Sequence, residues 1–476
     1  METTEIAPTA QSKLPKVATG DWISSLPDEI LSHILSFLPT KYAVGTSCLS
    51  RRWKDLWTGL YELDLDNRDT LLGNTGNRYE ILRRQDFEFT RFVDRVLREH
   101  KDLNSLRRFR IHFDAPNSKV SPNLLMRLRL ASDESRLEEM DVSFEVNRSC
   151  LPDTLYSLNR LKILKLNSAV LQSATKGSVL LPSLNMLQLL RVRIKDCESL
   201  SSLISGCPVL ETLHLENCYY SNRKEGDELI ASLPYLKNLT VISKGFLGNQ
   251  LCSFIIEAPC LEQLYLDHFS EFEFLDSSRP MSCLHSVHID IGHYRISERG
   301  LIRFLAHVSS AKEIHLSPQI LNVMLDFHRD VQLPIFPNLT RLTIEDPESS
   351  FVLHSLLNSA PKLQSIVIDL RDASMSWTKL ARTPRPQCLL SSLEEIKVKN
   401  IYADEDQMNM VAYLLKAGAV LKKVDVHLYE DVNYNDLSMQ HRAEDRDRLG
   451  SLLKLPRGSK ACEAHLFLPN GDEIGL

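Results

Sequence analysis

The chain has 476 residues, of which 25% are charged and 7% are aromatic, and its formal net charge at pH 7 is −6. Such a composition is ordinary for a folded protein with a large core. The acidic excess argues against nucleic acid as the main partner, because contacts with phosphates require a surplus of basic side chains. No apolar run approaches the roughly 18 residues of a membrane span, so we expect no membrane partner.

The N-terminus and the cysteines indicate where the protein works. Residues 1–20 are rich in Thr, Ala and Pro and lack an apolar stretch of signal-peptide length, so we expect disorder there. No two of the ten cysteines are two or three residues apart, unlike those of zinc-ribbon or thioredoxin motifs. We therefore expect reduced, mostly buried cysteines, no metal or other cofactor, and a cytoplasmic or nuclear protein.

Three short helices are predicted between residues 21 and 59. Pro27 fits the first position of a helix, where its missing N–H costs nothing. Apolar residues then recur at helical spacing until Pro39, which ends the helix. A second helix is predicted over Lys41–Leu49, and Ser50 can cap a third. A module of this size cannot bury every apolar side chain that it carries. It therefore either docks on the rest of the chain or offers an apolar face to a partner helix.

These helices resemble a plant F-box, whose signature combines LP-[DE]-E-I-L, I-L-S-F-L-P and S-x-L-S-[KR]-R-W. The chain follows it almost throughout in DWISSLPDEILSHILSFLPTKYAVGTSCLSRRWKDLW, apart from Trp22 and Cys48. The resemblance implies docking onto the Skp-type adaptor of a cullin-RING ubiquitin ligase. Alternatively, some matching residues, such as Ile34, Leu38 and Trp53, only hold the helices together. The matching adaptor-facing positions are Leu26, Pro27, Ile30, Ile34, Leu35, Leu38, Pro39, Val44, Leu49 and Trp53.

The pattern apolar-x-x-apolar-x-apolar recurs through the rest of the chain. Thirteen copies begin between Leu106 and Leu421, about 26 residues apart on average, and a further copy begins at Leu60. The last two apolar residues of each copy point the same way on a strand. Several connectors, such as ESLSSLISG and FVLHSLLNSA, predict helices. Each unit can bury its apolar sides only against neighbouring units, so the units should stack.

This pattern resembles the leucine-rich repeat, which implies an α/β solenoid over residues 60–384. The Asn or Cys expected three residues beyond the third apolar position is present at Cys218 but missing at Ala169, Phe269 and Pro347. We therefore expect an irregular horseshoe. The alternative is an ordinary α/β domain with leucine-rich strands. Before the copy at Leu106, the apolar residues of 89–97 predict an amphipathic helix.

Residues 385–476 form a separate C-terminal region. The segment DEDQMNMVAYLLKAG predicts a helix with the apolar stripe Met408, Val411, Leu414 and Leu415, and Gly418 stands at its C-terminal cap. Together with CLLSSLEEIKVKN and LLKLPRGSKACEAHLF, this segment resembles the FBD domain of plant proteins. The resemblance implies a domain without a catalytic role, and physically it caps the exposed end of the solenoid.

No reaction signature is present: the chain lacks P-loop, G-x-G-x-x-G and G-x-S-x-G motifs, so we expect no enzyme activity. The nearest metal-like cluster is His285, His288 and His293 with Asp290. On a strand His285 and His288 would point to opposite sides, which suits a metal poorly. Packed or solvated strand histidines are the preferred interpretation.

The repeats themselves predict a binding surface. The residue between the second and third apolar positions, and the residue after the third, face away from the core onto the concave side. The second of these columns is acidic in the middle repeats, which predicts a basic segment on the target; the alternative is a merely solvated sheet face. The candidate residues are His214, Glu216, Tyr265, Asp267, His288, Asp290, His315 and Glu345.

The sequence therefore predicts a non-catalytic, substrate-recognition subunit of a Skp-cullin-F-box ubiquitin ligase, with an unknown protein target on the solenoid. Two alternatives stay open. A small-molecule, hormone-like co-receptor would need a deep pocket ringed by Arg or Lys. An adaptor-independent scaffold would bury Leu26, Pro27 and Ile34 against its own repeats.

Overall fold

The computed structural model places most of the chain. The residues it describes are 23, 25–67, 78–113, 134–144, 153–171, 179–222, 228–243, 253–268, 272–274, 281–291, 297–325, 332–371, 384–402, 404–429, 447–451, 454, 456–468 and 471–474. Residues 1–20, with their predicted disorder, and His293 lie outside these ranges. None of the helices in the described ranges combines the length and apolar character of a bilayer crossing.

The N-terminal module contains two α-helices and two 3-10 helices. Pro27 and Pro39 each stand immediately before an α-helix, as N-caps rather than first helical residues. The second predicted helix is α-helical only as far as Gly45, a poor helix former, and continues as a 3-10 turn. The third is 3-10 throughout. The elements are α1 (Asp28–Ser36), α2 (Thr40–Gly45), η1 (Thr46–Cys48) and η2 (Trp53–Gly59).

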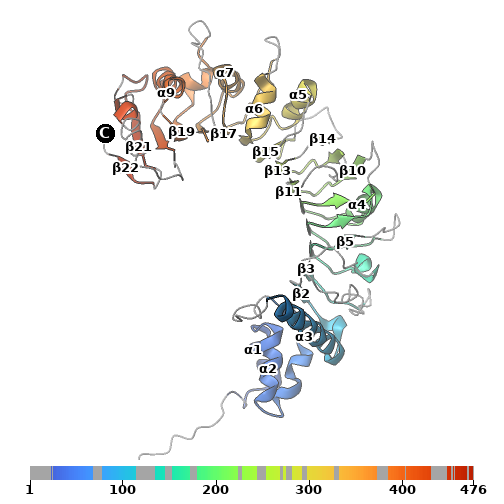
Figure 1. The fold of residues 1–476 in the computed structure, drawn as a ribbon. Coiled ribbons are helices and arrows are strands. Elements are labelled where there is room, and N and C mark those ends of the chain that lie inside the picture. The colour runs from blue at the N-terminus through green and yellow to red at the C-terminus, as the bar shows by residue number, and fades with distance from the viewer. Residues whose placement is uncertain are drawn as a thin grey trace, which may run out of the picture.

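All fourteen predicted repeat copies form strands of one sixteen-stranded sheet, in chain order and pairing in parallel, except that the last two strands pair antiparallel. The strands follow one another along a curved path from blue to red in Figure 1. They are β1 (Glu62–Asp66), β2 (Arg108–Phe113), β3 (Glu139–Phe144), β4 (Ile163–Asn167), β6 (Met186–Leu190), β8 (Thr212–Glu216), β11 (Asn238–Ile242), β13 (Gln263–Asp267), β15 (Ser286–Ile289), β16 (Glu313–Leu316), β17 (Arg341–Glu345), β18 (Ser365–Asp369), β19 (Glu395–Ile401), β20 (Lys423–Leu428), β21 (Glu463–Phe467) and β22 (Glu473–Ile474).

Most repeat helices cover the outer side of this curve, where Figure 1 shows α4, α5, α6, α7 and α9. The predicted helices before Pro208 and Pro361 are confirmed as α4 and α7, and the helix before β2 is confirmed as α3. The α-helices are α3 (Arg78–Glu99), α4 (Cys197–Ser205), α5 (Glu298–His307), α6 (Pro318–Leu325), α7 (Ser350–Ser359), α8 (Gln387–Ser391) and α9 (Glu405–Ala417), and short 3-10 turns are η4 (Leu103–Ser105) and η6 (Asp153–Ser157).

Several connectors in the middle of the chain contain strands instead of helices, which the sequence analysis missed. They form two small parallel sheets of three strands each. One consists of β5 (Val170–Leu171), β7 (Arg193–Ile194) and β9 (Tyr219–Tyr220), and the other of β10 (Glu228–Ser232), β12 (Ser253–Glu257) and β14 (Phe272–Phe274).

The core runs the length of the sheet, because the repeat strands alternate buried and half-buried residues. In β8, for example, Leu213 and Leu215 are buried while His214 between them is half-buried. Burying each such leucine contributes about 1.5–3 kcal/mol. In α9, Val411, Leu414 and Leu415 of the predicted stripe are buried, and Met408 is half-buried and packs against the core. The prediction did not include the buried Gln407 and Met410.

A left-handed residue recurs two positions after the third apolar residue of a repeat. Asn217 and Asp346 illustrate its role: each backbone N–H donates across to the next strand, to Ile242 and Asp369, at 2.7 Å. Asn, Asp and His accept this conformation more readily than most residues. Among the described residues, those with positive φ other than glycine are Ser168, Arg191, Asn217, His268, Asp346 and Asn400.

Candidate functional site

Helix α1 has one buried and one exposed apolar side. Leu31 and Leu35 lie in the core, with at most 1% of their surface exposed. Ile30, Ile34 and Leu38 follow one another at four-residue spacing and are 46%, 41% and 39% exposed. Ile30 and Ile34 are four residues apart on α1 and therefore share a helix face, and Leu38 follows two residues after the helix ends at Ser36. Together the three side chains make one exposed aliphatic strip at the end of the helix. We call it the α1 strip.

The structure sorts the ten predicted adaptor-facing residues into three groups. Pro27, Leu49 and the α1 strip are exposed, and Leu26, Pro39 and Val44 are half-buried. Leu35 and Trp53 are buried in the core, so their side chains hold the module together and offer no docking surface. Phe37 and Tyr42 are also exposed and were not predicted, because both fall outside the helical stripe of apolar residues.

The module packs directly on the first repeat. The buried Thr40 hydroxyl accepts a hydrogen bond from the Asp64 N–H of β1 at 2.8 Å. The Lys101 N–H donates to the Thr58 carbonyl at 2.9 Å. Arg52 joins the two ends of the module through an ion pair with Asp28 at 2.7 Å. The α1 strip is therefore presented by a module anchored to the repeat sheet.

Aromatic rings follow one another on the inner face of the sheet. The register pairs Tyr265 with His288 and His288 with His315, on β13, β15 and β16. The Tyr265 and His288 rings stack with centroids 4.1 Å apart, and His288 and His315 lie 4.3 Å apart at 58°. Burial, together with repulsion from His315, lowers the pKa of His288 to about 4. His288 is therefore neutral at pH 7 and acts as a flat, polar ring.

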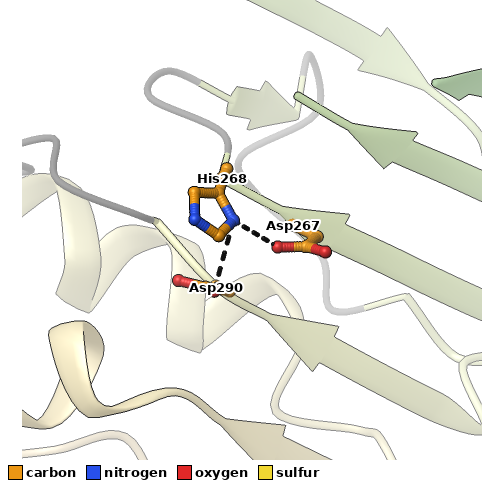
Figure 2. A group of neighbouring side chains, drawn as sticks. All are labelled: Asp267, His268 and Asp290. Carbon is orange, nitrogen blue, oxygen red and sulfur yellow. Dashed lines mark hydrogen bonds and ion pairs between the residues drawn. The ribbon is translucent and has the colours of Figure 1, made fainter. Parts of the chain in front are cut away.

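The acidic column is balanced by basic groups, as Figure 2 shows for its best-buried member. The Asp267 carboxylate is 6% exposed and lies 2.5 Å from Nδ1 of His268, which is also 3.6 Å from the Asp290 carboxylate. His268 was not among the predicted residues. It follows the acidic position in the left-handed conformation described above, and that conformation is not visible in an apolar pattern.

Glu345 and Asp369 belong to a second charged group. His315 Nε2 lies 3.0 Å from the Glu345 carboxylate, a hydrogen bond that lowers the pKa of Glu345. Arg371 lies 3.3 Å from Asp369 and 3.8 Å from Glu345. Arg371 also was not predicted, since it follows the strand rather than occupying either column.

His214 and Glu216 form a separate pair, with Nε2 and Oε2 3.2 Å apart. In the register Ile242 of β11 lies between Glu216 and Asp267. The eight predicted residues therefore fall into two groups: this pair, and a larger group from Tyr265 to Glu345.

A shallow hollow of about 340 Å³ opens between β11, β13 and β15 beside the stacked rings. Its lining carries amides and hydroxyls and includes no Arg or Lys. The lining residues are Asn238, Leu239, Thr240, Ile242, Gln263, Leu264, Tyr265, Ser286 and His288.

Within the described ranges, Asp267, His268 and Asp290 bring donor atoms within 4.8 Å of one another, a set that could ligate a metal ion. His268 Nδ1 itself lies 2.5 Å from the Asp267 carboxylate and 3.6 Å from the Asp290 carboxylate, so the same atoms already contact one another. Of the predicted histidine cluster, His285 is exposed ahead of β15 and His288 is stacked on Tyr265.

Three families match successive parts of the chain. Residues 23–64 match the F-box domain, residues 127–272 match the LRR repeats of the family described as FBD-associated F-box protein At5g56370, and residues 383–426 match FBD. Among curated proteins of Arabidopsis thaliana, FBD-associated F-box protein At1g66310 is 31% identical over 93% of this chain and 95% of its own length. F-box/LRR-repeat protein 13 shows the same identity and coverage, and F-box/FBD/LRR-repeat protein At1g78750 is 30% identical over 93% of this chain and 95% of its own. The chain thus belongs to the plant F-box/FBD/LRR-repeat protein family.

Proposed function

We propose that this chain is the substrate-recognition subunit of a Skp-cullin-F-box ubiquitin ligase. The N-terminal module docks on the Skp-type adaptor, and the repeats form an irregular horseshoe that holds a target protein near the ubiquitin-conjugating enzyme. The chain contributes proximity, which raises the effective concentration of the target, and no catalytic group.

The observation that carries this proposal is the α1 strip. Aliphatic side chains gathered on one exposed face are costly to hydrate, and such faces suit a groove or helix of a partner. The strip lies within the 23–64 match to the F-box domain. The eight predicted adaptor-facing residues outside the core, joined by Phe37 and Tyr42, make up the proposed interface.

Replacing Ile30 and Ile34 together by alanine tests the adaptor interface. Both side chains are exposed, so the fold should stay intact. Truncating an anchor residue of an interface typically lowers the binding free energy by more than about 1–2 kcal/mol. The affinity for the adaptor should therefore weaken at least about tenfold. The measurement is adaptor affinity by calorimetry, or co-purification of the coexpressed pair.

Ile335 and Leu390 provide the matched control. They are aliphatic, 57% and 47% exposed, and lie in the repeat and FBD regions. Their double alanine variant should bind the adaptor like the unchanged chain. Undiminished adaptor binding by the Ile30/Ile34 variant would contradict the proposal.

On the inner face, the group from Tyr265 to Glu345 is the proposed centre of target binding. It combines two stacked rings, a hollow with amide and hydroxyl groups, and three carboxylates whose partners include histidines. A basic target segment would replace the histidines as partner of these carboxylates, while its aliphatic or guanidinium part lies on the Tyr265 ring.

Replacing Asp267, Asp290 and Glu345 by alanine tests this centre. Capture of ubiquitinated targets from plant extract, with proteasome activity blocked, should fall several-fold because the attraction for basic groups is removed. Adaptor binding by the same variant serves as the control and should stay constant. Unchanged target capture would remove the proposed centre and leave the adaptor interface standing.

Neither alternative is favoured by an observation. The hollow is shallow and has no Arg or Lys in its lining, unlike the pocket expected of a hormone-like co-receptor. Pro27 and Ile34 are exposed, whereas an adaptor-independent scaffold would cover them with its own repeats.

A further inference from the structure

Two exposed cysteines occupy equivalent places in neighbouring repeats. Of the cysteines that the structure describes, Cys48, Cys260 and Cys283 are exposed, and Cys197, Cys207, Cys218, Cys388 and Cys462 are buried. Cys260 immediately precedes the first leucine of one repeat, and Cys283 immediately precedes the first leucine of the next. The expectation of mostly buried cysteines therefore has three exceptions among the described cysteines, two of which are at positions related by the repeat.

The backbone around the two cysteines is the same. Each cysteine is the third residue of a four-residue turn, closed by hydrogen bonds from Leu261 N–H to Ala258 and from Leu284 N–H to Met281, both at 3.2 Å. The following strands β13 and β15 pair in register, with Gln263 opposite Ser286. Cys260 and Cys283 each stand three residues earlier, so the register places them opposite one another.

Neighbouring turns of this kind approach closely. Parallel strands lie about 4.8 Å apart, within the roughly 4.4–6.8 Å between Cα atoms that a disulfide requires. Two serines at the cysteine position show that a side chain here can reach the preceding turn. The hydroxyl of Ser183 donates to the carbonyl of Asn159 at 2.7 Å, and that of Ser392 to Pro361 at 3.1 Å. For Cys283, the preceding turn is the one that contains Cys260.

We propose that Cys260 and Cys283 form a reversible disulfide that joins two neighbouring repeats. A small-molecule disulfide such as glutathione disulfide supplies the oxidising equivalents. One protein thiolate displaces a glutathione and forms a mixed disulfide, and the second thiolate then displaces the other glutathione. Two protein thiols are oxidised, the two thiol protons are released to the glutathione products, and one glutathione disulfide becomes two glutathiones.

Three of the buried cysteines do not compete for this reaction. Burial raises the pKa of Cys207, Cys218 and Cys388 to about 12, so these thiols are almost never in the reactive thiolate form at pH 7. The bond would tie together the turns that lead into β13 and β15, the strands that carry Tyr265 and His288. The disulfide therefore lies at the edge of the group from Tyr265 to Glu345 on the inner face. Its formation depends only on the repeat geometry.

The test exposes the purified full-length chain to glutathione disulfide and maps its disulfides by mass spectrometry without reduction. A protease that cleaves after glutamate separates Cys260 from Cys252, because Glu257 and Glu262 flank Cys260. We expect a linked pair of peptides containing Cys260 and Cys283, the loss of both thiols together, and recovery of both on adding dithiothreitol. Cys48 should carry only mixed disulfide.

The Cys283→Ser variant supplies the diagnostic comparison, because Cys260 should then stop at the mixed disulfide with glutathione. Equal yields of mixed disulfide on Cys260 in the variant and the unchanged chain would overturn the proposal, as would a link from Cys260 to a different cysteine.

Val209 and Tyr235 give a matched control for the geometry, since both are exposed and directly precede the first leucine of adjacent repeats. In a chain lacking Cys260 and Cys283, Val209→Cys with Tyr235→Cys should link in the same way. Val209→Cys paired with Cys283 alone, three repeats apart, should not. Linking of this distant pair to the same extent would show that chain mobility, rather than register, brings the thiols together.

Discussion

The α1 strip and the inner face of the sheet are both open to solvent, but their side chains are arranged in opposite ways. Ile30, Ile34 and Leu38 present only hydrocarbon to water. On the sheet, carboxylates meet partners within the chain, as Asp267 does with His268 at 2.5 Å and Glu345 with His315 at 3.0 Å. One surface is apolar and exposed, and the other is polar, with the Asp267 and Glu345 carboxylates partnered within the chain.

This difference suits two kinds of partner. Burial of an exposed apolar strip against a complementary groove is favourable in free energy and needs no exact pairing of polar groups. Such a strip therefore suits one constant partner. Carboxylates that already have partners within the chain cost little to leave open to solvent, and a target must replace those partners with equally good ones. Selectivity among targets is therefore expected on the sheet and constant affinity on α1.

The strongest test of this contrast uses two adjacent residues of α1. Leu35 is 1% exposed and Ile34 is 41% exposed. Leu35→Ala should lower the free energy of unfolding by about 2–5 kcal/mol, because it leaves a cavity in the core. Ile34→Ala should change it by less than about 0.5 kcal/mol. Chemical denaturation followed by fluorescence of the buried Trp53 and Trp57 measures both, and equal losses would show that Ile34 also belongs to the core.

Binding at the two surfaces should also differ in its dependence on salt. At about 0.5 M NaCl the Debye length falls to a few ångströms, which screens attraction between the carboxylates and a basic target. Target capture should then drop by roughly tenfold relative to low salt, whereas adaptor affinity should hold steady because apolar burial does not depend on screening. Both are measured on the same preparation, and parallel losses would mean that the two surfaces do not differ in this way.

The sequence predicted the repeat strands because each of them has two buried apolar residues two positions apart, a spacing that only a strand explains. It missed β21, where Ala461 and Ala464 stand in place of the first two apolar residues. It missed the outer strands because runs such as ELIAS, SFIIE and FEF are too short to distinguish from irregular connectors. A strong apolar pattern determines the sheet, whereas the outer layer depends on packing that no pattern records.

The inner face was predictable to a similar extent. Which residues share a column follows from the repeat alone, so Tyr265, His288 and His315 could be placed together beforehand. Which groups pair does not follow, since it depends on backbone conformation and rotamers after the strand. His268 reaches Asp267 and Asp290 from a left-handed residue, and Arg371 reaches Asp369 from beyond β18. The charges in the sequence predicted only an acidic column, without the partners of its carboxylates.

The smallest expected effect is a loss of folding stability at low pH. The pKa of His288 is about 4 in the folded chain against 6.5 as a free side chain, so the unfolded chain binds the proton more readily. This histidine therefore costs no stability above about pH 6.5, and it lowers stability as the pH falls from 6.5 toward 4. Partial exposure reduces the effect to about 1 kcal/mol at pH 5.

His288→Phe should remove that loss while keeping a ring against Tyr265. Denaturation at pH 7.5 and pH 5 measures the difference, and exposed His285→Phe controls for the loss of any histidine. The α1 strip contains no titratable side chain, so adaptor affinity should not share this dependence in the His288 variant. If His288→Phe loses as much stability at pH 5 as the unchanged chain, His288 is not the neutral ring of the inner face, and the polar side of the contrast would rest on the ion pairs alone.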